Sequence, residues 1–496
     1  MTRSRGGAGK TPIAPVLLPA AVAAGLLGVG GWMVTRAASA PATAPATAPA
    51  AERADAPASD QRAAPAGEVA RIEDEPELPL AASVYSFPSK LIPGTQASAL
   101  LAAVRAADPD RELLALVDPP QRQALAAAVA PLRVRLLETR GGPYSPWPRD
   151  PFSFARTASG AVRVVVRPNL QPGREVDSEL GRELVQDLPP ELDRAWGGVR
   201  WSVAAVPFHN GQVLLTREAA WVTLHTFEPR ALQLLGVARV PVQSFGSAAG
   251  IDAYVGAVRR AADELATLYG RPVRFVHPLP PAAAGVASEA SAPAISTEMM
   301  RRIGGGAGYD LDSLVTFIPS RDGRAAALVA DLAAGQQLLA DAPAPALATL
   351  AASYDLQPGA DVRAALAAEA NAPRGRALAS FLDLVAEHLA AQGFRVSRLP
   401  LLLVPTALLR GGGDDRYPHF LLGWNNVVVE TRDGVVRAEG FASLLPAGDD
   451  RAKAVFAAAG AHLDLLPPLV ESVVRNGGYR CASNHLRQPG RRGAGV

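Results

Sequence analysis

The sequence predicts an α/β fold, because helix-like and strand-like segments alternate over residues 77–489. Residues 97–107 (ASALLAAVRAA) place apolar side chains at helical spacing, and residues 161–167 (AVRVVVR) form a short valine-rich run typical of a strand. Apolar residues make up 49% of the chain, which is enough to bury a sizeable core. No glycine-rich dinucleotide-binding motif follows a strand-like run, so the pattern does not require a nucleotide-binding sheet.

The remaining elements follow the same two patterns. Helical spacing recurs at residues 120–130, 251–268, 323–341 and 361–391, the last with an interruption expected near Pro373. Strand-like runs recur at 133–137, 212–215, 219–224, 273–276, 314–318, 400–404 and 426–430. Residues 281–297 are rich in Ala, Ser and Pro, and we expect them to form a surface insertion.

The amino-terminal region predicts a membrane anchor or a signal peptide in residues 1–36. A basic flank precedes residues 12–34, which carry no charge. At ~1.5 Å per residue, this run is long enough to cross a ~30 Å hydrocarbon layer. The basic flank favours an amino terminus in the cytoplasm and an exported domain. Ala38-Ser39-Ala40 also fits a cleavage site, so the domain is expected outside the cytoplasm, either anchored in the membrane or secreted or periplasmic after cleavage near Ala40.

Two further segments are expected to lie outside the folded domain. Residues 37–76 are rich in Ala, Pro and Thr and have little apolar surface to bury, so we expect a disordered linker. Residues 490–496 are expected to form a disordered tail. The folded domain is therefore predicted to span residues 77–489.

Charge and cysteine content exclude several classes of protein. The net charge is +2, which gives no support for nucleic-acid binding. The chain has one cysteine, Cys481, so it cannot form an internal disulfide or a thiolate metal cluster within one chain. Cys481 is either a buried small side chain or a reactive thiol.

Two motifs in the middle of the chain carry candidate functional residues. Trp147-Pro148-Arg149-Asp150 is rigid and sets an aspartate at a defined point, although Arg149 and Asp150 can also form a weak surface ion pair. Asp310 and Asp312 lie two apart at the head of an apolar run, which predicts two carboxylates on one face of a strand. Such a pair can hold a divalent metal, but no further oxygen ligands occur at a useful spacing, so we expect no metal site.

The third motif surrounds the single cysteine. Asn476-Gly477-Gly478-Tyr479-Arg480 precedes Cys481, and paired glycines allow the backbone to pass close to another group. A cation beside the sulfur is expected to lower the pKa of the thiol and favour the thiolate. This setting favours the reactive interpretation of Cys481.

These three motifs, in this order, resemble those of the guanidine-modifying (pentein) superfamily, most of all the catalytic domain of the peptidylarginine deiminases. Residues 310–319 (DLDSLVTFIP) are similar to the family's strand HVDEFLSFVP, and residues 481–489 (CASNHLRQP) are similar to its CGTNVRRKP. Residues 147–150 (WPRD) resemble the W-x-x-D motif of deiminases. The resemblance implies a five-bladed, pseudo-symmetric α/β propeller over residues 77–489, with the site in its central funnel.

The resemblance also implies roles for individual residues. Cys481 would be the nucleophile that attacks a guanidinium carbon. Asp150 and Asp312 would hold the planar cation by paired hydrogen bonds, with Trp147 beside the substrate. Asp310 stands where the family has its proton-transferring histidine, and His209 is a possible base in its place.

Two functions follow from this pattern. The first is a deiminase-like hydrolase acting on peptidyl-arginine or on a small arginine-like compound. The alternative is a catalytically degenerate propeller that binds arginine-like or peptide ligands without turnover. No cofactor is expected, although calcium, which the animal peptidylarginine deiminases use, stays open because no ligand positions can be transferred.

Overall fold

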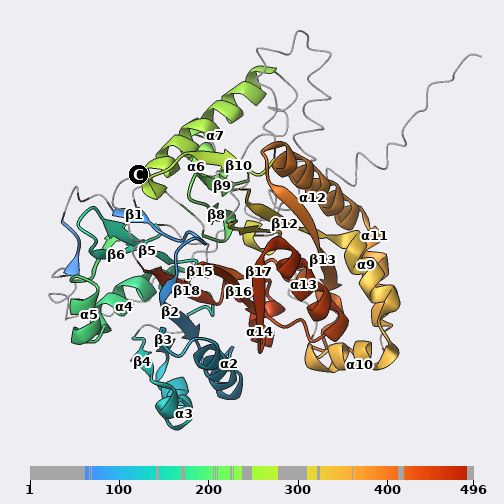
Figure 1. Cartoon of the computed structure of the whole chain (residues 1–496), viewed down its shortest axis with the longest axis horizontal. Coiled ribbons are helices and arrows are strands. Elements are labelled where there is room, and N and C mark those ends of the chain that lie inside the picture. The colour runs from blue at the N-terminus through green and yellow to red at the C-terminus, as the bar shows by residue number, and fades with distance from the viewer. Residues whose placement is uncertain are drawn as a thin grey trace, which may run out of the picture. The chain divides into compact units, whose positions relative to one another are not determined.

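The described part of the chain alternates strands and helices and forms a mixed α/β fold, as the sequence predicts (Figure 1). A computed structural model describes residues 62–65, 68, 70–140, 144–168, 174–204, 206, 208, 210–223, 226, 228–236, 248–277, 310–320, 324–359, 361–411 and 418–488. The segments predicted at 12–34, 38–40 and 281–297 lie outside these ranges, as does His209. None of the helices within the described ranges is long and apolar enough to cross a membrane.

The strands in these ranges form five sheets. The first sheet has the order β1 (Ala70–Ile72), β5 (Phe152–Thr157), β6 (Val162–Val166) and β7 (Arg200–Val203). The second has the order β10 (Val273–Phe275), β9 (Ala220–Val222) and β8 (Val213–Leu215). The third has the order β11 (Val315–Ile318), β12 (Ala326–Asp331), β13 (Arg395–Pro405) and β14 (His419–Gly423). The fourth has the order β15 (Val428–Arg432), β16 (Val435–Phe441) and β17 (Ala461–Leu466). The fifth has the order β18 (Ser483–Arg487), β2 (Leu80–Phe87), β3 (Glu112–Val117) and β4 (Val134–Glu138).

Each sheet contains the same ββαβ unit. Two antiparallel strands come first, and helices then lead to a third strand that lies parallel to the second. The units are β5-β6-β7, β8-β9-β10, β11-β12-β13, β15-β16-β17 and β18-β2-β3. The fifth unit combines the two ends of the described chain, because β18 pairs with β2.

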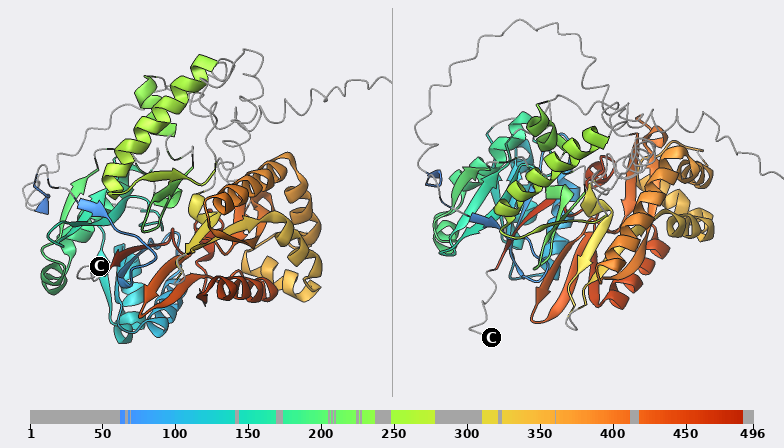
Figure 2. Two further views of the ribbon diagram at one scale, coloured as in Figure 1. Left: turned by 45° about the horizontal axis from the view of Figure 1, so that its top comes forward. Right: turned by 90° about the horizontal axis from the view of Figure 1, so that it is seen from above.

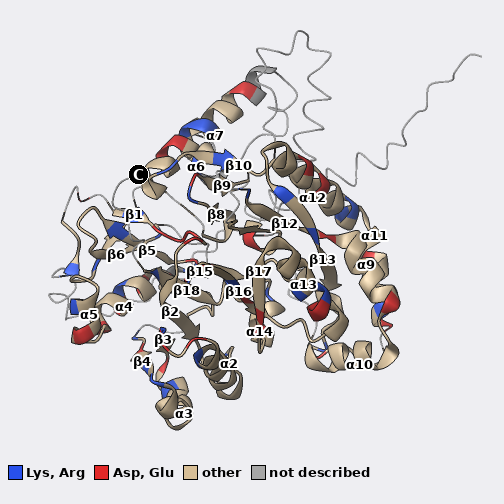
Figure 3. Ribbon diagram, viewed as in Figure 1, with Lys and Arg blue, Asp and Glu red and all other residues tan. Residues whose placement is uncertain are grey.

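Most helices connect parallel strands and lie toward the rim, whereas α14 connects the fourth sheet to β18; β8, β15 and β18 lie near the middle (Figure 1). The α-helices in the described ranges are α2 (Gly94–Ala107), α3 (Pro119–Val129), α4 (Leu180–Asp187), α5 (Pro190–Ala195), α6 (Glu228–Leu235), α7 (Ala248–Tyr269), α9 (Leu332–Asp341), α10 (Ala344–Ser353), α11 (Val362–Asn371), α12 (Pro373–Ala391), α13 (Pro446–Ala459) and α14 (Val470–Val473). Figure 2 shows the helices of the third unit, coloured yellow to orange, along the outer side of their sheet. Both charge signs occur on single helices, as on α7 (Figure 3).

Local signals explain where several helices begin. The carboxylates of Asp118, Asp331 and Asp361 accept hydrogen bonds from backbone N–H groups in the first turns of α3, α9 and α11. Pro373 begins α12, because proline fits the first helical position but lacks the N–H that a helix interior needs. The interruption predicted near Pro373 is therefore confirmed.

Apolar clusters join each sheet to the next. Between the second and third sheets, Trp221 and Phe317 lie with their ring centroids 5.4 Å apart. Burying each large apolar side chain contributes about 1.5–3 kcal/mol, so these clusters fix the strands relative to one another. The other four clusters join the first and second sheets (Val165, Val213), the third and fourth (Leu328, Val436), the fourth and fifth (Phe441, Tyr85), and the fifth and first (Val84, Phe154).

Two expectations from the sequence are wrong in detail. Residues 323–341 are not one helix, because Ala326–Asp331 forms the central strand β12 and α9 starts only at Leu332. The ordered chain also begins before residue 77: Ala70–Ile72 forms β1, which pairs with β5. Side-chain contacts explain the earlier start, since Asp74 makes ion pairs with buried arginines.

The number of sheets equals the number of blades that the family resemblance implies. Hydrogen bonds between strands do not join the five sheets into one closed array within the described residues. The structure therefore shows a mixed α/β fold of five sheets, and the closed propeller stays a prediction.

Candidate active site

The candidate site is built from polar residues that directly precede the first strand of each ββαβ unit. In chain order they are Asp150, Asn210–Gln212, Asp310 with Asp312, Asn426, and Arg480 with Cys481. Hydrogen bonds link Gln212 to Asp310, Arg480 to the carbonyl of Asn210, and Asn426 to both Asp312 and Cys481. The side-chain amide of Asn210 also donates to the carbonyl of Arg149, beside Asp150, so the five strand starts meet at one place.

A thiol and two carboxylates form the centre of the site. One side-chain ligand atom each from Cys481, Asp310 and Asp312 lie within 4.8 Å of one another. The Sγ atom of Cys481 is 3.9 Å and 4.0 Å from the two carboxylate oxygens of Asp312. Asp312 and Cys481 are buried, and Asp310 is half-buried. The structure thus brings together the residues that the sequence proposes as nucleophile and guanidinium clamp.

The two aspartates do not lie on a strand, contrary to the expectation from their spacing. Leu311–Ser313 forms a 3₁₀ turn, in which the N–H of Ser313 donates to the carbonyl of Asp310 at 3.0 Å. The strand itself begins at Val315. The proximity of Asp310 and Asp312 therefore comes from a tight turn and not from the two-residue period of a strand.

Asn426 holds the thiol and the carboxylate together, and the sequence interpretation missed it. Its Nδ2 donates to Asp312 Oδ1 at 2.8 Å and contacts Cys481 Sγ at 3.1 Å. Its Oδ1 accepts from the backbone N–H of Cys481 at 3.1 Å. A signal existed in the chain, since Asn426 precedes a valine-rich strand just as Asp150 and Cys481 precede theirs.

The thiol of Cys481 is not activated by a neighbouring cation, so that expectation is wrong. Burial raises its pKa well above its usual value, and the nearby charges of Asp312, Asp310 and Asp150 raise it further. The hydrogen bond from Asn426 opposes this effect. Arg480 is adjacent in sequence, but its guanidinium points to carboxylates.

Arg480 connects buried Asp312 to half-buried Asp74. Its Nη1 donates to Asp312 Oδ2 at 2.7 Å, and its Nη2 donates to Asp74 Oδ2 at 3.1 Å. The carbonyl oxygens of Asn210 and Val213 accept further hydrogen bonds from the same guanidinium. Arg480 is therefore fixed by contacts on several sides.

Burial and neighbouring charges together raise the pKa of Asp312 and lower the pKa of Asp74. Burial raises the pKa of Asp312 to about 6, and Asp310 adds to this rise while Arg480 and Arg149 oppose it. Burial also opposes ionisation of Asp74, but Arg149, Arg487 and Arg480 together hold its pKa well below the usual range. Asp312 is thus the carboxylate that can exchange a proton near neutral pH.

The Trp147–Asp150 motif is part of the site and not a surface ion pair. Arg149 is buried and pairs with Asp74, whereas Asp150 is buried and pairs with Arg174 at 2.7 Å. The guanidinium of Arg174 also lies over the ring of Trp147, 5.0 Å from the centroid. Two residues that the resemblance assigns to substrate binding therefore contact an arginine of the chain itself.

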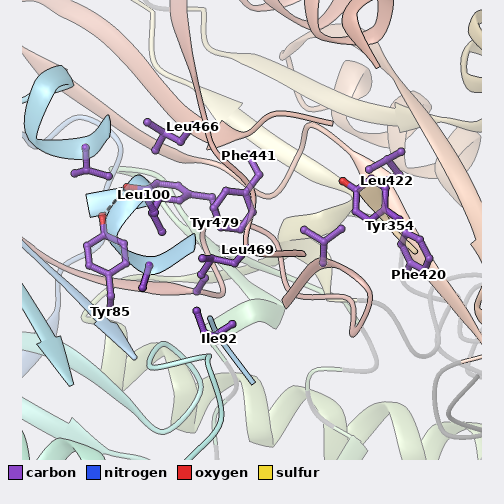
Figure 4. Packing of buried hydrophobic residues seen from close by; sticks show 14 of the residues in the cluster. Tyr85, Ile92, Leu100, Tyr354, Phe420, Leu422, Phe441, Leu466, Leu469 and Tyr479 are labelled. Carbon is purple, nitrogen blue, oxygen red and sulfur yellow. Dashed lines mark hydrogen bonds between the residues drawn. The ribbon is translucent and has the colours of Figure 1, made fainter. Parts of the chain in front are cut away.

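The glycines before the cysteine have the role that the sequence suggests. A Cβ atom at Gly477 would collide with the indole of Trp147, and one at Gly478 would collide with Asn426. The backbone of this segment therefore passes directly against both groups. Tyr479 anchors the segment: its ring packs on Phe441 at 5.5 Å, and its hydroxyl lies 2.8 Å from that of Tyr85 (Figure 4).

The proposed base His209 lies outside the described residues, but the chain after it borders the site. Nε2 of Gln212 donates to Asp310 Oδ1 at 2.8 Å, and Gly211 lies against the same carboxylate. No histidine in the described ranges belongs to the group around Cys481. His485 is buried instead between Ser83 and Ser483. A catalytic role for His209 stays a prediction.

The thiol and two carboxylates do not fit calcium. Calcium takes six to eight oxygen ligands, whereas this group offers one sulfur and two carboxylates, one of which Arg480 already neutralises.

A pocket borders the site. Ser313, Asn426 and Gly478 line its polar end, and Trp424 and Phe441 line an apolar part. The pocket therefore joins an apolar wall to the amide that contacts the thiol.

The fold and the site together define a class of mixed α/β proteins with a thiol and carboxylates gathered at the strand starts. Solved structures similar to this chain include agmatine deiminases and a structure provisionally assigned as a peptidyl-arginine deiminase. The resemblance stated from the motifs is thus confirmed at the level of fold. No protein-family model matches the sequence, and neither does any curated protein.

Three of these structures illustrate the likeness. An agmatine deiminase of Enterococcus faecalis shares 12% identity, with 86% of this chain and 99% of that chain covered and a TM-score of 0.50. An agmatine deiminase of C. jejuni shares 10% identity over 85% of this chain and 96% of that chain, with a TM-score of 0.48. A crystal structure provisionally assigned as a peptidyl-arginine deiminase shares 8% identity over 85% and 99%, with a TM-score of 0.44. At such identities the likeness shows the fold alone.

Proposed function

We propose that this protein is a deiminase-like hydrolase that acts on a guanidinium group through Cys481. The observation that carries the proposal is the position of the Cys481 thiol, which is 3.9 Å from a carboxylate oxygen of Asp312 and beside Asp310. A thiol and a carboxylate pair are the groups needed to attack a planar cation and to hold it. The similarity in fold to agmatine deiminases supports the same reaction class.

The chemistry begins with ionisation of the thiol. In the free protein the pKa of Cys481 is raised by burial and by three nearby aspartates. A bound guanidinium would bring a positive charge into this field and lower the thiol pKa. The substrate would therefore promote its own attack, and the proton released by sulfur would pass to Asp310, which lies beside the thiol and stands where the family has its proton-transferring histidine.

The remaining steps balance in atoms and charge. The sulfur forms a bond to the guanidinium carbon, and the bond from that carbon to a terminal nitrogen breaks. The nitrogen takes the proton and leaves as ammonia. Water then adds to the carbon and the carbon–sulfur bond breaks. One proton of this water returns to the sulfur, and the other converts the ammonia to ammonium. One water is consumed, and a ureido product and ammonium are released.

The substrate is proposed to be peptidyl-arginine or a small arginine-like compound. The apolar part of the neighbouring pocket suits the aliphatic chain that carries such a guanidinium. Agmatine is the first small candidate, since it is named in the similar structures.

One assay tests the hydrolase. The full chain is incubated with agmatine, free arginine and an arginine-containing peptide, with and without calcium, and the ureido product and ammonia are measured. We expect product from the wild type and a loss on the order of 10³-fold or more in Cys481→Ala, because the nucleophile is gone. Circular dichroism checks that the variant is folded. Product that persists in the folded Cys481→Ala protein excludes Cys481 as the nucleophile.

A second candidate function is ligand binding without turnover. It is favoured by the arginines on Asp150 and Asp312 and by the absence of a described histidine from the group around Cys481. Saturable agmatine binding without product, weakened in Asp150→Ala, supports the binder over the enzyme.

We also infer the setting of the domain. The five ββαβ sheets, packed each against the next, are proposed to be the blades of a five-bladed propeller. Residues 12–34 are proposed to tether or export the domain, so that it acts outside the cytoplasm.

A further inference from the structure

An arginine of the chain occupies what has the form of a guanidinium-binding subsite. Nη1 of Arg174 donates to Asp150 Oδ2 at 2.7 Å, and its Nε donates to Asp177 Oδ2 at 2.8 Å. Nη2 donates to Ser145 Oγ at 2.8 Å. The face of the guanidinium lies over Trp147, 5.0 Å from the ring centroid. Two carboxylates, a hydroxyl and an aromatic face are the groups that recognise a guanidinium in general.

This subsite includes residues assigned to the substrate from the sequence. Asp150 and Trp147 both contact Arg174, and Asp150 lies close enough to Cys481 to affect the pKa of its thiol. The other assigned carboxylate, Asp312, is paired with Arg480. Each carboxylate meant for a substrate cation therefore already has a cation from the chain.

The two arginines differ in how they are held. Arg480 follows Tyr479 in the backbone and donates to two backbone carbonyls as well as to Asp312 and Asp74. The hydrogen bonds that the Arg174 guanidinium makes within the described residues go to side chains, and its side chain is 16% exposed, against 7% for Arg480. Arg174 is thus the partner that an incoming cation can replace.

We propose that Arg174 is an internal occupant of the guanidinium subsite, and that an arginine-like ligand binds at Asp150 only by displacing it. This inference takes its ligand class, a guanidinium compound, from the proposed function. It does not require that the protein turn the ligand over. The measured Kd then equals the intrinsic Kd divided by the fraction of molecules in which Arg174 has left the subsite empty. Removing Arg174 then strengthens ligand binding, whereas removing a merely structural arginine does not.

Binding without chemistry tests this proposal. The full chain carrying Cys481→Ala is titrated with agmatine by calorimetry, with and without Arg174→Ala. Putrescine, which lacks the guanidinium, is the control ligand. We expect Arg174→Ala to bind agmatine on the order of tenfold more tightly, with no comparable gain for putrescine.

The chain offers a matched control variant. Arg182 also lies over a tryptophan, 4.5 Å from the ring centroid of Trp201, and pairs with Glu179 at 3.1 Å. Arg182→Ala removes the same two kinds of contact without touching Asp150, and we expect its agmatine affinity to equal that of the parent.

The outcomes separate the two proposals. If folded Arg174→Ala binds agmatine no more tightly than Arg182→Ala, the internal occupant is excluded, whatever the turnover assay shows. If agmatine binds more tightly but the Cys481 protein makes no product, the occupant stands and the hydrolase fails. Arg174→Gln, which keeps a side chain of similar length without the cation, takes the place of Arg174→Ala if the latter does not fold, with the same gain expected.

Discussion

Arg111 and Arg480 are both buried arginines that bind more than one carboxylate, but only Arg480 lies beside a thiol. Arg111 donates to both oxygens of Glu439 at 2.7 Å and to Asp108 at 3.0 Å. Tyr479 joins this network through its hydroxyl, which donates to Glu439 at 2.9 Å. The next two residues of the chain, Arg480 and Cys481, belong to the candidate site, so the two networks meet at consecutive positions.

The networks differ in how like charges are arranged. Burial opposes ionisation of Asp108, but Arg432 and Arg111 lower its pKa below the usual value. At the site, Asp310 lies beside Asp312, and burial together with this like charge raises the pKa of Asp312 to about 6. A buried ion pair alone therefore does not mark a functional site. Crowded like charges beside a nucleophile are the feature that sets the site apart.

The largest predicted difference between the networks is in stability. Arg111→Met leaves buried Glu439 without the arginine that binds both of its oxygens, while Asp108 keeps Arg432. We therefore expect a loss of about 3–5 kcal/mol in the free energy of unfolding. Arg480→Met should cost less at pH 6, because Asp312 takes up a proton instead of staying charged. Urea unfolding of both variants at pH 6 measures this. Equal losses would show that the two networks are electrostatically alike.

The next prediction concerns pH and uses the raised pKa of Asp312. Its folded value of about 6 lies above its usual value of 3.8. Between these values the folded state binds more protons than the unfolded state, so the contribution of Asp312 to stability falls as pH rises from about 4 to 6 and is constant above. The total change is about 3 kcal/mol.

Asp312→Asn removes this titration. We expect the free energy of unfolding of the wild type, minus that of Asp312→Asn, to fall by about 2 kcal/mol between pH 4 and pH 7, since part of the total change lies outside this range. Urea unfolding of both proteins at pH 4, 5, 6 and 7 gives the difference, in which other titrating groups largely cancel. A difference that does not change with pH would contradict the raised pKa.

The smallest predicted effect comes from a comparison of the side-chain amide of Asn426 with that of Asn425. Asn426→Ala removes the donor to Cys481 Sγ and raises the thiol pKa further, so alkylation by chloroacetamidine at pH 8 should slow by roughly 3- to 10-fold. Asn425→Ala is the control, because the Asn425 amide donates to the carbonyl of Leu328. If both folded variants react at the wild-type rate, Asn426 does not position the thiol.

Much of the fold follows from local sequence patterns. Valine-rich runs such as 161–167 form strands because their branched side chains pack on both faces of a sheet, and β6 confirms this. Residues 326–331 (AALVAD) were expected in a helix, since alanine and leucine favour helices locally. They form a strand because they pair with β11 on one side and β13 on the other. The local sequence does not show that these two strands lie beside them.

The candidate site is predicted from the sequence only in part. Cys481, Asp312 and Asp310 meet as their motifs suggest. Of the partners that set their charge states, Asp74 comes from a segment without a recognisable motif, and Asn426 is indicated only by its position before a valine-rich strand. The direction of the thiol pKa is wrong in the sequence interpretation because adjacency in sequence does not say where a long side chain such as Arg480 points.

The pairing of β18 with β2 has a consequence for how the protein is made. Ser83 and His485, which hydrogen-bond across this pair, are separated by 402 positions. A ribosome adding 5–20 residues per second needs roughly 20–80 s to travel that distance. During this interval β2 waits with an unpaired edge, and Cys481 does not yet exist. Strand completion and the arrival of the thiol are therefore a single late event, so an incomplete chain does not contain the complete candidate site.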